Sequence, residues 1–78
     1  MGIIYTEYAD ETIIERKIGK ESIKQAIITP DEIVDGKDNR KIAHKIIGDK
    51  LLRVVFEKEV KAYIVITAYY TQPRRYIK

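Results

Sequence analysis

Arginine, lysine and tyrosine residues in the second half of the chain are the side chains whose types and spacing could carry chemistry. Arg53 and Tyr69 each lie in a segment of alternating residues, and the chain ends in a basic stretch that contains tyrosine. Arginine binds phosphate oxygens through paired hydrogen bonds and stabilises charge in a transition state. Tyrosine stacks on bases and can transfer a proton. We therefore predict an RNA-directed face, with Arg53, Tyr69, Arg75 and Tyr76 as catalytic candidates and Lys41, Lys45, Arg53, Arg74 and Arg75 as nucleic-acid-binding candidates.

Cleavage of RNA without a metal ion needs a base for the 2′-hydroxyl, a cation for the phosphate and an acid for the leaving oxygen. Lysine, arginine and tyrosine can fill these three roles. The chain has no cysteine and a single histidine, His44, which argues against a disulfide and against a zinc site built from protein ligands alone. No cofactor and no metal ion is therefore expected. His44 has the same parity as Ile42 and Ile46, which favours a core or edge position over a catalytic one.

A simpler interpretation explains the same cations as a solvated surface. The net charge is +3 and the sequence pI is about 9.2, which permits an anionic partner without requiring one. Arg53 can pair with Glu57, and Tyr69 can pack on a half-exposed sheet. Arg16 can be a charge at a helix end. The residues alone leave both interpretations open.

Two helices are predicted in the first half of the chain. Thr6 can cap a first helix over residues 6–17, whose early turns carry acidic side chains. Apolar residues at helical spacing predict a second helix over residues 20–29. Pro30 ends this helix, because the residue before a proline avoids helical geometry.

From residue 40 onward the apolar pattern changes to a period of two, which indicates strands. Residues 40–47 alternate weakly, residues 51–57 form a clear strand, and residues 60–71 form the longest apolar run. A strand that is apolar on both faces is expected at the centre of a sheet. Residues 1–5 are interpreted as a short apolar lead and residues 31–35 as a short segment that could be extended. The predicted fold is α+β, with two N-terminal helices packed on one face of a three- to four-stranded antiparallel sheet.

Parity along the predicted strands assigns side chains to the two faces of this sheet. The face that meets the helices is expected to carry Leu52, Val54, Phe56, Ile64 and Ile66. The opposite face would gather Arg53, Thr67 and Tyr69, and Lys41 and Lys45 would join them if Ile42 and Ile46 point to the core.

The length of the chain, 78 residues, fits one domain, residues 1–78. No run of about 18 apolar residues is present, which argues against a helix that spans a membrane. The first residues lack the basic and apolar regions of a secretory signal, so we expect a cytoplasmic protein. A sheet of this size can also pair edge to edge, which would give a homodimer.

Five short motifs follow one another along the chain: Arg-Lys-Ile at 16–18, Pro-Asp at 30–31, Leu-Arg-Val-Val-Phe at 52–56, Ile-Thr-Ala-Tyr at 66–69 and Arg-Tyr at 75–76. In order and spacing they resemble a prokaryotic family of domains of unknown function that is related by fold to the RelE/ParE toxins. The likeness covers nearly the whole chain.

This resemblance implies a RelE-like, RNA-cleaving site on the face of the sheet. Arg53 matches an arginine that these toxins carry in the penultimate strand, and Lys45 is the nearest match to the lysines that precede it. Their basic, tyrosine-containing C-terminal segment is matched by Arg74, Arg75 and Tyr76. RelE cuts messenger RNA on the ribosome, so the implied partners are RNA and a neutralising antitoxin protein.

Two positions depart from the pattern of that family. Its early histidine-alanine pair falls at Tyr8-Ala9 here, and its next arginine falls at Thr12. ParE-like relatives keep the fold but act on gyrase instead of RNA. The alternative function is therefore a non-catalytic module on the same fold that binds nucleic acid or a protein.

Overall fold

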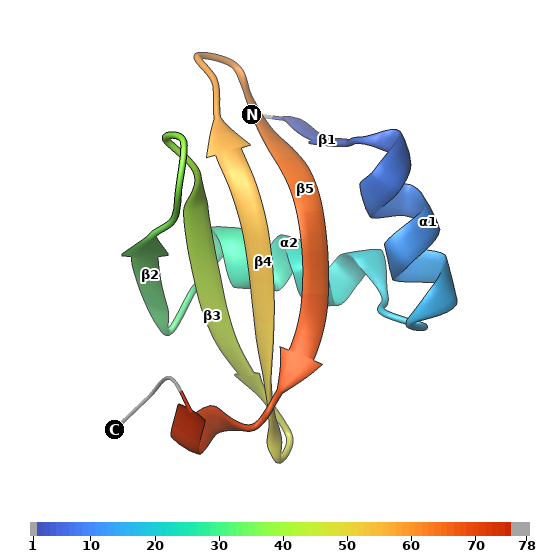
Figure 1. The fold of residues 1–78 in the computed structure, drawn as a ribbon, viewed down its shortest axis with the longest axis vertical. Helices are drawn as coiled ribbons and strands as arrows, with labels where there is room; N and C mark the ends of the chain where they lie inside the picture. Colours follow the sequence, from blue (N-terminus) through green and yellow to red (C-terminus); the bar gives the residue numbers. More distant parts are fainter. Residues whose placement is uncertain (1, 76–78) are drawn as a thin grey trace.

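Five strands and two α-helices make up the computed structural model, which describes residues 2–75 (Figure 1). In chain order the elements are β1 (Gly2–Tyr5), α1 (Glu7–Glu15), α2 (Lys20–Ile28), β2 (Glu32–Asp35), β3 (Lys41–Ile47), β4 (Lys50–Lys58), β5 (Ala62–Thr71) and the short 3-10 helix η1 (Pro73–Arg75). The predicted α+β class is confirmed, and both helices were predicted at nearly the observed positions.

The sheet has the strand order β1-β5-β4-β3-β2. β1 runs parallel to β5, and the other neighbours are antiparallel. The predicted three- to four-stranded antiparallel sheet was therefore wrong in strand count and in direction at one edge. The difference is residues 2–5, which form a strand and not a lead. Four residues are too few to show an alternating pattern, and the partner strand lies near the other end of the chain.

Local interactions at the ends explain where the two helices begin and stop. The Thr6 side chain accepts a hydrogen bond from the amide of Ala9 at 3.0 Å, which caps the start of α1. Lys17, just after α1, has a φ of 56°, and the Ile18 amide bonds back to the Ile13 carbonyl at 3.0 Å, which closes the last turn. α2 ends at Ile28, two residues before the proline.

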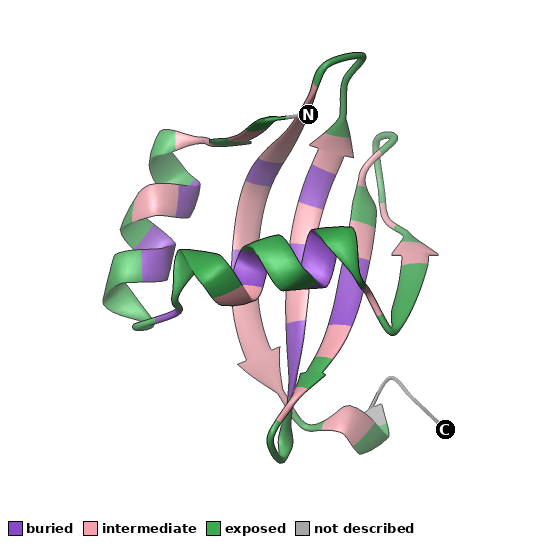
Figure 2. Ribbon diagram, turned by 180° about the vertical axis from the view of Figure 1, so that it is seen from behind, coloured by how far each residue is buried: buried purple, intermediate pink, exposed green. Residues whose placement is uncertain are grey.

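The hydrophobic core lies between the two helices and one face of the sheet. α2 crosses this face, and α1 runs beside β1 and β5 at the edge (Figure 2). The predicted orientation of β4 is confirmed, because Leu52, Val54 and Phe56 are all buried in this core. The other core residues are Ala9, Ile13, Ile18, Ile23, Ala26, Ile27, Ala43, Val65 and Ala68.

A β-bulge in β5 reverses which side chains of this strand face the helices. Val55 pairs with Thr67, but Phe56 pairs with Val65, so Ile66 is one extra residue on β5. A bulge of this kind shifts the alternation by one position. Val65 is therefore fully buried in the core, and Ile66 is not. The prediction that Ile64 and Ile66 face the helices was wrong, because it assumed an unbroken period of two.

The orientation of β3 also differs from the prediction. Ala43 pairs with Val54 and joins the core, whereas His44 pairs with Arg53 on the opposite face. The expectation that Ile42 and Ile46 point to the core was therefore wrong. Both parities of β3 carry apolar side chains, so alternation alone does not identify the buried face.

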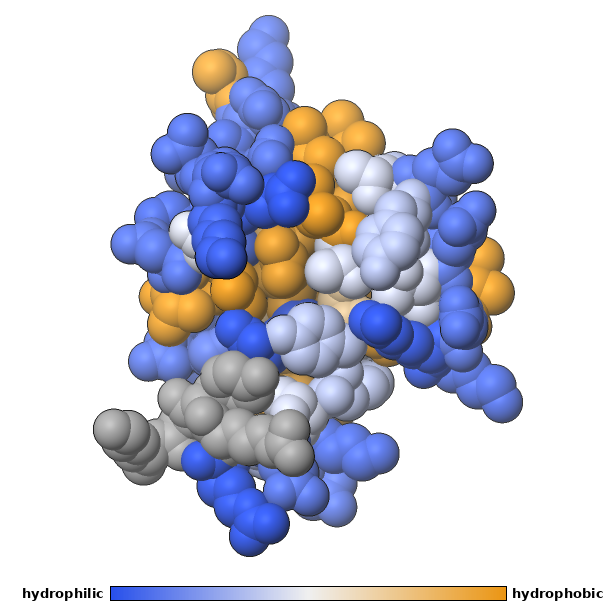
Figure 3. Space-filling view, in the orientation of Figure 1, coloured by the Kyte–Doolittle hydropathy of each residue, from blue (hydrophilic) through white to orange (hydrophobic). Residues whose placement is uncertain are grey.

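We call the sheet face opposite α2 the open face, because both helices contribute their buried side chains to the other face (Figures 1 and 2). Val34, Ile42, Val55 and Thr67 form a row across four strands of the open face, as their pairing shows. Apolar surface lies in the upper middle of this face, next to residues of intermediate hydropathy and within hydrophilic margins (Figure 3). In the described part of the chain, no helix combines the length and the apolar character needed to cross a membrane.

The bulge can be tested by the stability of two neighbouring substitutions. Val65→Ala removes two methyl groups from a closed core and should lower the free energy of unfolding by about 2 kcal/mol. Ile66→Ala removes more atoms but from the open face, so it should cost less. Urea denaturation of both variants measures the difference. A larger loss for Ile66→Ala would show that the unbroken alternation is right and the bulge is wrong.

Tyr5 provides a test at alkaline pH. Burial raises the pKa of Tyr5 above its usual 10.0, and the nearby charge of Asp10 raises it further. The folded protein therefore holds the phenol proton more tightly than the unfolded chain does. This contribution is fully present below about pH 10 and is lost as pH rises through the folded-state pKa. In denaturation experiments between pH 9 and 11.5, Tyr5→Phe should lose less stability than the parent. Parallel curves for the two proteins would contradict this.

Candidate functional site

Strand pairing brings four polar side chains into a line across the open face. Glu32 of β2 pairs with His44 of β3, His44 pairs with Arg53 of β4, and Arg53 pairs with Tyr69 of β5. Paired residues on neighbouring strands have side chains on the same face, so all four lie side by side. We call these four residues, together with Arg16 from the end of α1, the polar row.

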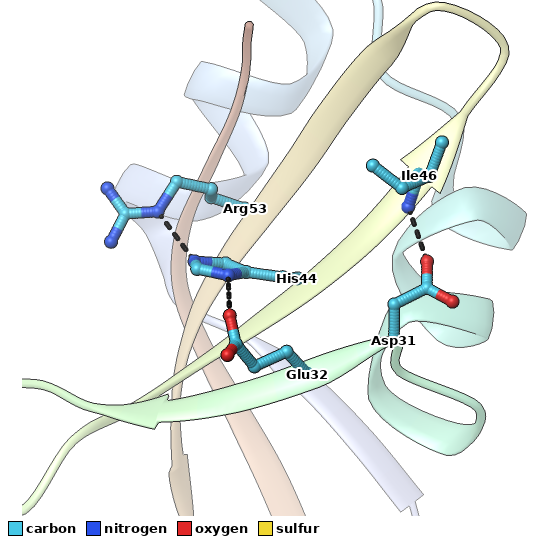
Figure 4. Close-up of polar contacts among 5 residues, drawn as sticks. All are labelled: Asp31, Glu32, His44, Ile46 and Arg53. Atoms are coloured by element: carbon cyan, nitrogen blue, oxygen red, sulfur yellow. Dashed lines mark hydrogen bonds and ion pairs between the residues drawn. The ribbon is translucent and has the colours of Figure 1, made fainter. Parts of the chain in front are cut away.

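His44 is held from both sides within the polar row. Its Nδ1 lies 3.0 Å from Glu32 Oε1, and its Nε2 accepts a hydrogen bond from Arg53 Nε at 3.0 Å (Figure 4). Arginine stays protonated and can only donate. Nε2 must therefore be the acceptor, and the ring proton lies on Nδ1 toward Glu32. Because His44 is only 2% exposed, these two contacts replace water.

The register that brings Glu32 to His44 is fixed by Asp31. The Asp31 carboxylate accepts a hydrogen bond from the Ile46 amide at 2.7 Å (Figure 4). The Asp31 amide donates to the His44 carbonyl at 2.8 Å. These bonds join the segment after Pro30 to β3, so the carboxylate of the next residue, Glu32, is held beside His44 Nδ1.

Two arginines lie beside the ring of Tyr69. Arg53 Nη1 donates a hydrogen bond to the Tyr69 hydroxyl, and the Arg53 guanidinium carbon lies 5.5 Å from the ring centroid. The guanidinium carbon of Arg16 lies 5.9 Å from the same centroid. Arg16 Nη1 also donates to the Ala68 carbonyl at 2.8 Å, which ties the end of α1 to β5. Two cations and one aromatic ring thus converge on the open face, which is an arrangement that attracts a phosphate group.

Arg53 and Tyr69 are the two predicted catalytic candidates that the structure brings into contact. The predicted lysines lie elsewhere. Pairing with Phe56 and Leu52 places Lys41 and Lys45 on the helix side of the sheet. Lys41 forms an ion pair with Asp35, and Lys45 Nζ donates to the Thr29 carbonyl at the end of α2, at 2.8 Å. The prediction that both lysines share a face with Arg53 was wrong for the same reason as the orientation of β3.

The basic tail is described only in part. Arg74 is exposed in η1, and its Nε donates to Gln72 Oε1 at 3.1 Å. Arg75 is placed in η1 by its backbone, and Tyr76 lies outside the described residues. Their predicted roles remain predictions.

Glu32, His44 and Arg16 belong to the polar row, but the sequence analysis gave none of them a functional role. For His44 the signal was present, because placing Ala43 in the core would have turned the histidine toward Arg53. For Arg16 the signal was its spacing. Positions 8, 12 and 16 follow one another at four-residue intervals, so they lie on one side of α1. Tyr8 is 60% exposed and Thr12 is 6% exposed.

One cavity of the described structure lies on the helix side of the sheet, away from the polar row. It is a cleft of about 620 Å³ lined by Ile3, Tyr5, Lys20, Glu21, Lys24, Ile27, Ile28 and Tyr63. In this cleft, Lys20 Nζ forms an ion pair with Asp10 Oδ1 at 3.2 Å and lies 4.5 Å from the centroid of the Tyr5 ring. Within residues 2–75, no three histidine, cysteine or acidic side chains gather into a possible metal site.

Comparison with known families identifies the chain as a member of one of them. Residues 5–70 match DUF4258, a domain of unknown function, and the chain belongs to this family. The match includes all five residues of the polar row and stops before Arg74. No curated protein and no solved structure was found to match the chain.

The link between Arg53 and His44 can be measured with a double-mutant cycle. Arg53→Met keeps the aliphatic stem but removes the donor to a buried nitrogen, which should cost about 1–3 kcal/mol of stability. His44→Leu removes the acceptor. Because the residues are in contact, the loss of stability in the double variant should differ from the sum of the two single losses by about 0.5 kcal/mol or more. Lys58→Met, at the exposed end of β4, should instead be additive with His44→Leu. Additivity of both pairs would show that the link contributes nothing.

Proposed function

We propose that this DUF4258 protein binds RNA through the polar row and cleaves it without a metal ion, as expected for a relative of the RelE/ParE toxins. The observation that carries the proposal is the convergence of Arg16 and Arg53 on the ring of Tyr69. This convergence lies on the sheet face that the helices leave uncovered.

The chemistry of the row suits a phosphodiester. Guanidinium groups recognise phosphate oxygens with directed hydrogen bonds, and two of them concentrate positive charge at one point of the sheet. The adjacent row of Val34, Ile42, Val55 and Thr67 gives bases an apolar surface next to the cations. Tyr69 adds an aromatic ring, which supports base stacking at RNA-binding sheets.

Cleavage would follow from the same groups. In this scheme the ribose 2′-hydroxyl gives up its proton as its oxygen attacks phosphorus, and the 5′-oxygen takes up a proton as its bond to phosphorus breaks, which leaves a 2′,3′-cyclic phosphate and a 5′-hydroxyl. Arg53 and Arg16 stabilise the charge that develops on the phosphate oxygens. The Tyr69 hydroxyl, which accepts a hydrogen bond from Arg53, would exchange a proton with a reacting oxygen. His44 is too deeply buried to act as the base. Arg74, Arg75 and Tyr76 remain candidate contributors from the tail.

One observation favours a second candidate function, a binding module without catalysis. Tyr8 and Thr12 occupy the positions of the usual histidine and arginine, and they lie on the side of α1 that leads to Arg16. An arginine at position 12 would replace a side chain that is only 6% exposed, so restoring that residue would disturb packing. Tyr8→His is the better restoration, because Tyr8 is largely exposed. If Tyr8→His cleaves RNA and the parent only binds it, the binding module is the correct interpretation.

The test is a titration of single-stranded RNA at two salt concentrations, with a cleavage gel in the presence of EDTA. Arg16→Gln should weaken binding about tenfold and reduce the slope of log K against log salt by about 0.7, the value for one lost phosphate contact. Lys24 is exposed on α2, on the other side of the sheet. Lys24→Gln removes the same charge there, so this variant should bind RNA as the parent protein does. Tyr69→Phe should slow cleavage at least about tenfold while retaining most of the binding.

Equal losses for Arg16→Gln and Lys24→Gln would show that binding is unspecific charge attraction. The absence of RNA binding by the parent protein would overturn the proposal as a whole.

A further inference from the structure

We propose that His44 is a positioning residue that holds Arg53 in the polar row, and that uptake of a second proton by His44 releases Arg53. This inference concerns regulation of the candidate site, and its effect on RNA rests on the proposed function. The holding interaction itself stands on geometry alone.

The first step is the direction of the hydrogen bond between the two side chains. Arg53 Nε lies 3.0 Å from His44 Nε2, and the arginine can only be the donor. On the other side of the ring, Glu32 Oε1 lies 3.0 Å from Nδ1, where the ring proton must be. Glu32 therefore selects the tautomer of His44 that can accept from Arg53.

The second step is the effect on Arg53. A free arginine side chain has many rotamers, but here Nε is bound to His44 and Nη1 to the Tyr69 hydroxyl. Two bonds from one planar group fix both its position and the orientation of its plane. His44 is itself buried and held by Glu32, so it is a rigid anchor. A phosphate would thus meet a guanidinium that is already oriented.

The third step is what a second proton does. It would occupy Nε2 and turn the acceptor of the Arg53 bond into a donor that faces another donor, with two positive charges in contact. Histidine is the side chain whose ordinary titration lies between pH 5 and 8. Within the polar row, the charged groups that face His44 are Glu32 from β2 and Arg53 from β4. Tyr69, and Arg16 at the end of α1, lie beyond Arg53. Glu32 attracts the added charge and Arg53 repels it, so the Arg53 contact is the one that breaks.

The holding interaction can be tested without RNA by nitrogen-15 NMR of the full chain. At pH 7.5, the ring nitrogens of His44 should show a proton on Nδ1 and a scalar coupling from Nε2 to Arg53 Nε through the hydrogen bond. As His44 takes up its second proton, the coupling should disappear and Nε2 should become protonated, while the proton on Nδ1 stays and the amide spectrum shows that the protein remains folded. A proton on Nε2 at pH 7.5, or a coupling that persists when His44 is doubly protonated, would overturn the inference.

Its effect on the site is tested by RNA binding between pH 7.5 and 5 at constant ionic strength. His44→Gln is the matched variant, because its side-chain oxygen can accept from Arg53 but does not titrate. The parent should lose about tenfold more affinity than His44→Gln as the pH falls, the size expected for one lost charge-assisted hydrogen bond. The comparison removes pH effects common to both proteins, and a histidine with only a structural role would not produce the difference.

Identical pH profiles for the parent and His44→Gln would show that His44 does not regulate the site. If neither protein binds RNA at any pH, the proposed function fails, and the NMR result still decides whether His44 holds Arg53.

Discussion

The hydrogen bond from Arg53 to His44 is the interaction on which the open face depends. It crosses from β4 to β3, and it satisfies a nitrogen that is shut off from water. On one side it is supported by Glu32, and on the other side it continues to Tyr69. Leaving a polar atom unsatisfied in such a place costs about 1–3 kcal/mol, which is a large share of the stability of a small domain. The chemistry of the face and the alignment of its strands therefore constrain each other.

Arg16 extends this coupling to the helices. The end of α1 carries a guanidinium that reaches the Ala68 carbonyl of β5, and Ala68 itself is part of the core. The hydrogen bond satisfies a backbone oxygen while the cation stays beside the Tyr69 ring. The packing of α1 against β5 thus sets the distance between the two arginines. A residue that looks like an ordinary charge at a helix end is in this way part of the candidate site.

Much of the fold could be predicted from the sequence, but the faces of two strands could not. Thr6 and Pro30 mark helix ends through local chemistry, and Leu52, Val54 and Phe56 alternate without interruption, so these features were read correctly. The bulge at Ile66 leaves no local signal in the sequence, because this part of β5 carries apolar side chains on both faces of the strand. β3 has isoleucines in both parities, so only its pairing with β4 decides that Ala43 faces the helices and His44 faces the opposite side. The predicted site residues Arg53 and Tyr69 are in contact in the structure. Glu32 and His44 were given no role, because their place beside Arg53 depends on that pairing.

The parallel pairing of β1 with β5 has a consequence for the dynamics of the molecule. It joins the beginning of the chain to its last strand, so it closes a loop that includes nearly every other element. Such a contact is entropically the most expensive to form, and only four residue pairs compensate for it. We infer that β1 is the last strand to join the sheet in folding and the first to leave it in local opening. The edge of β5 beside Tyr63 and Val65 would then be uncovered transiently, while the polar row on the middle strands stays intact.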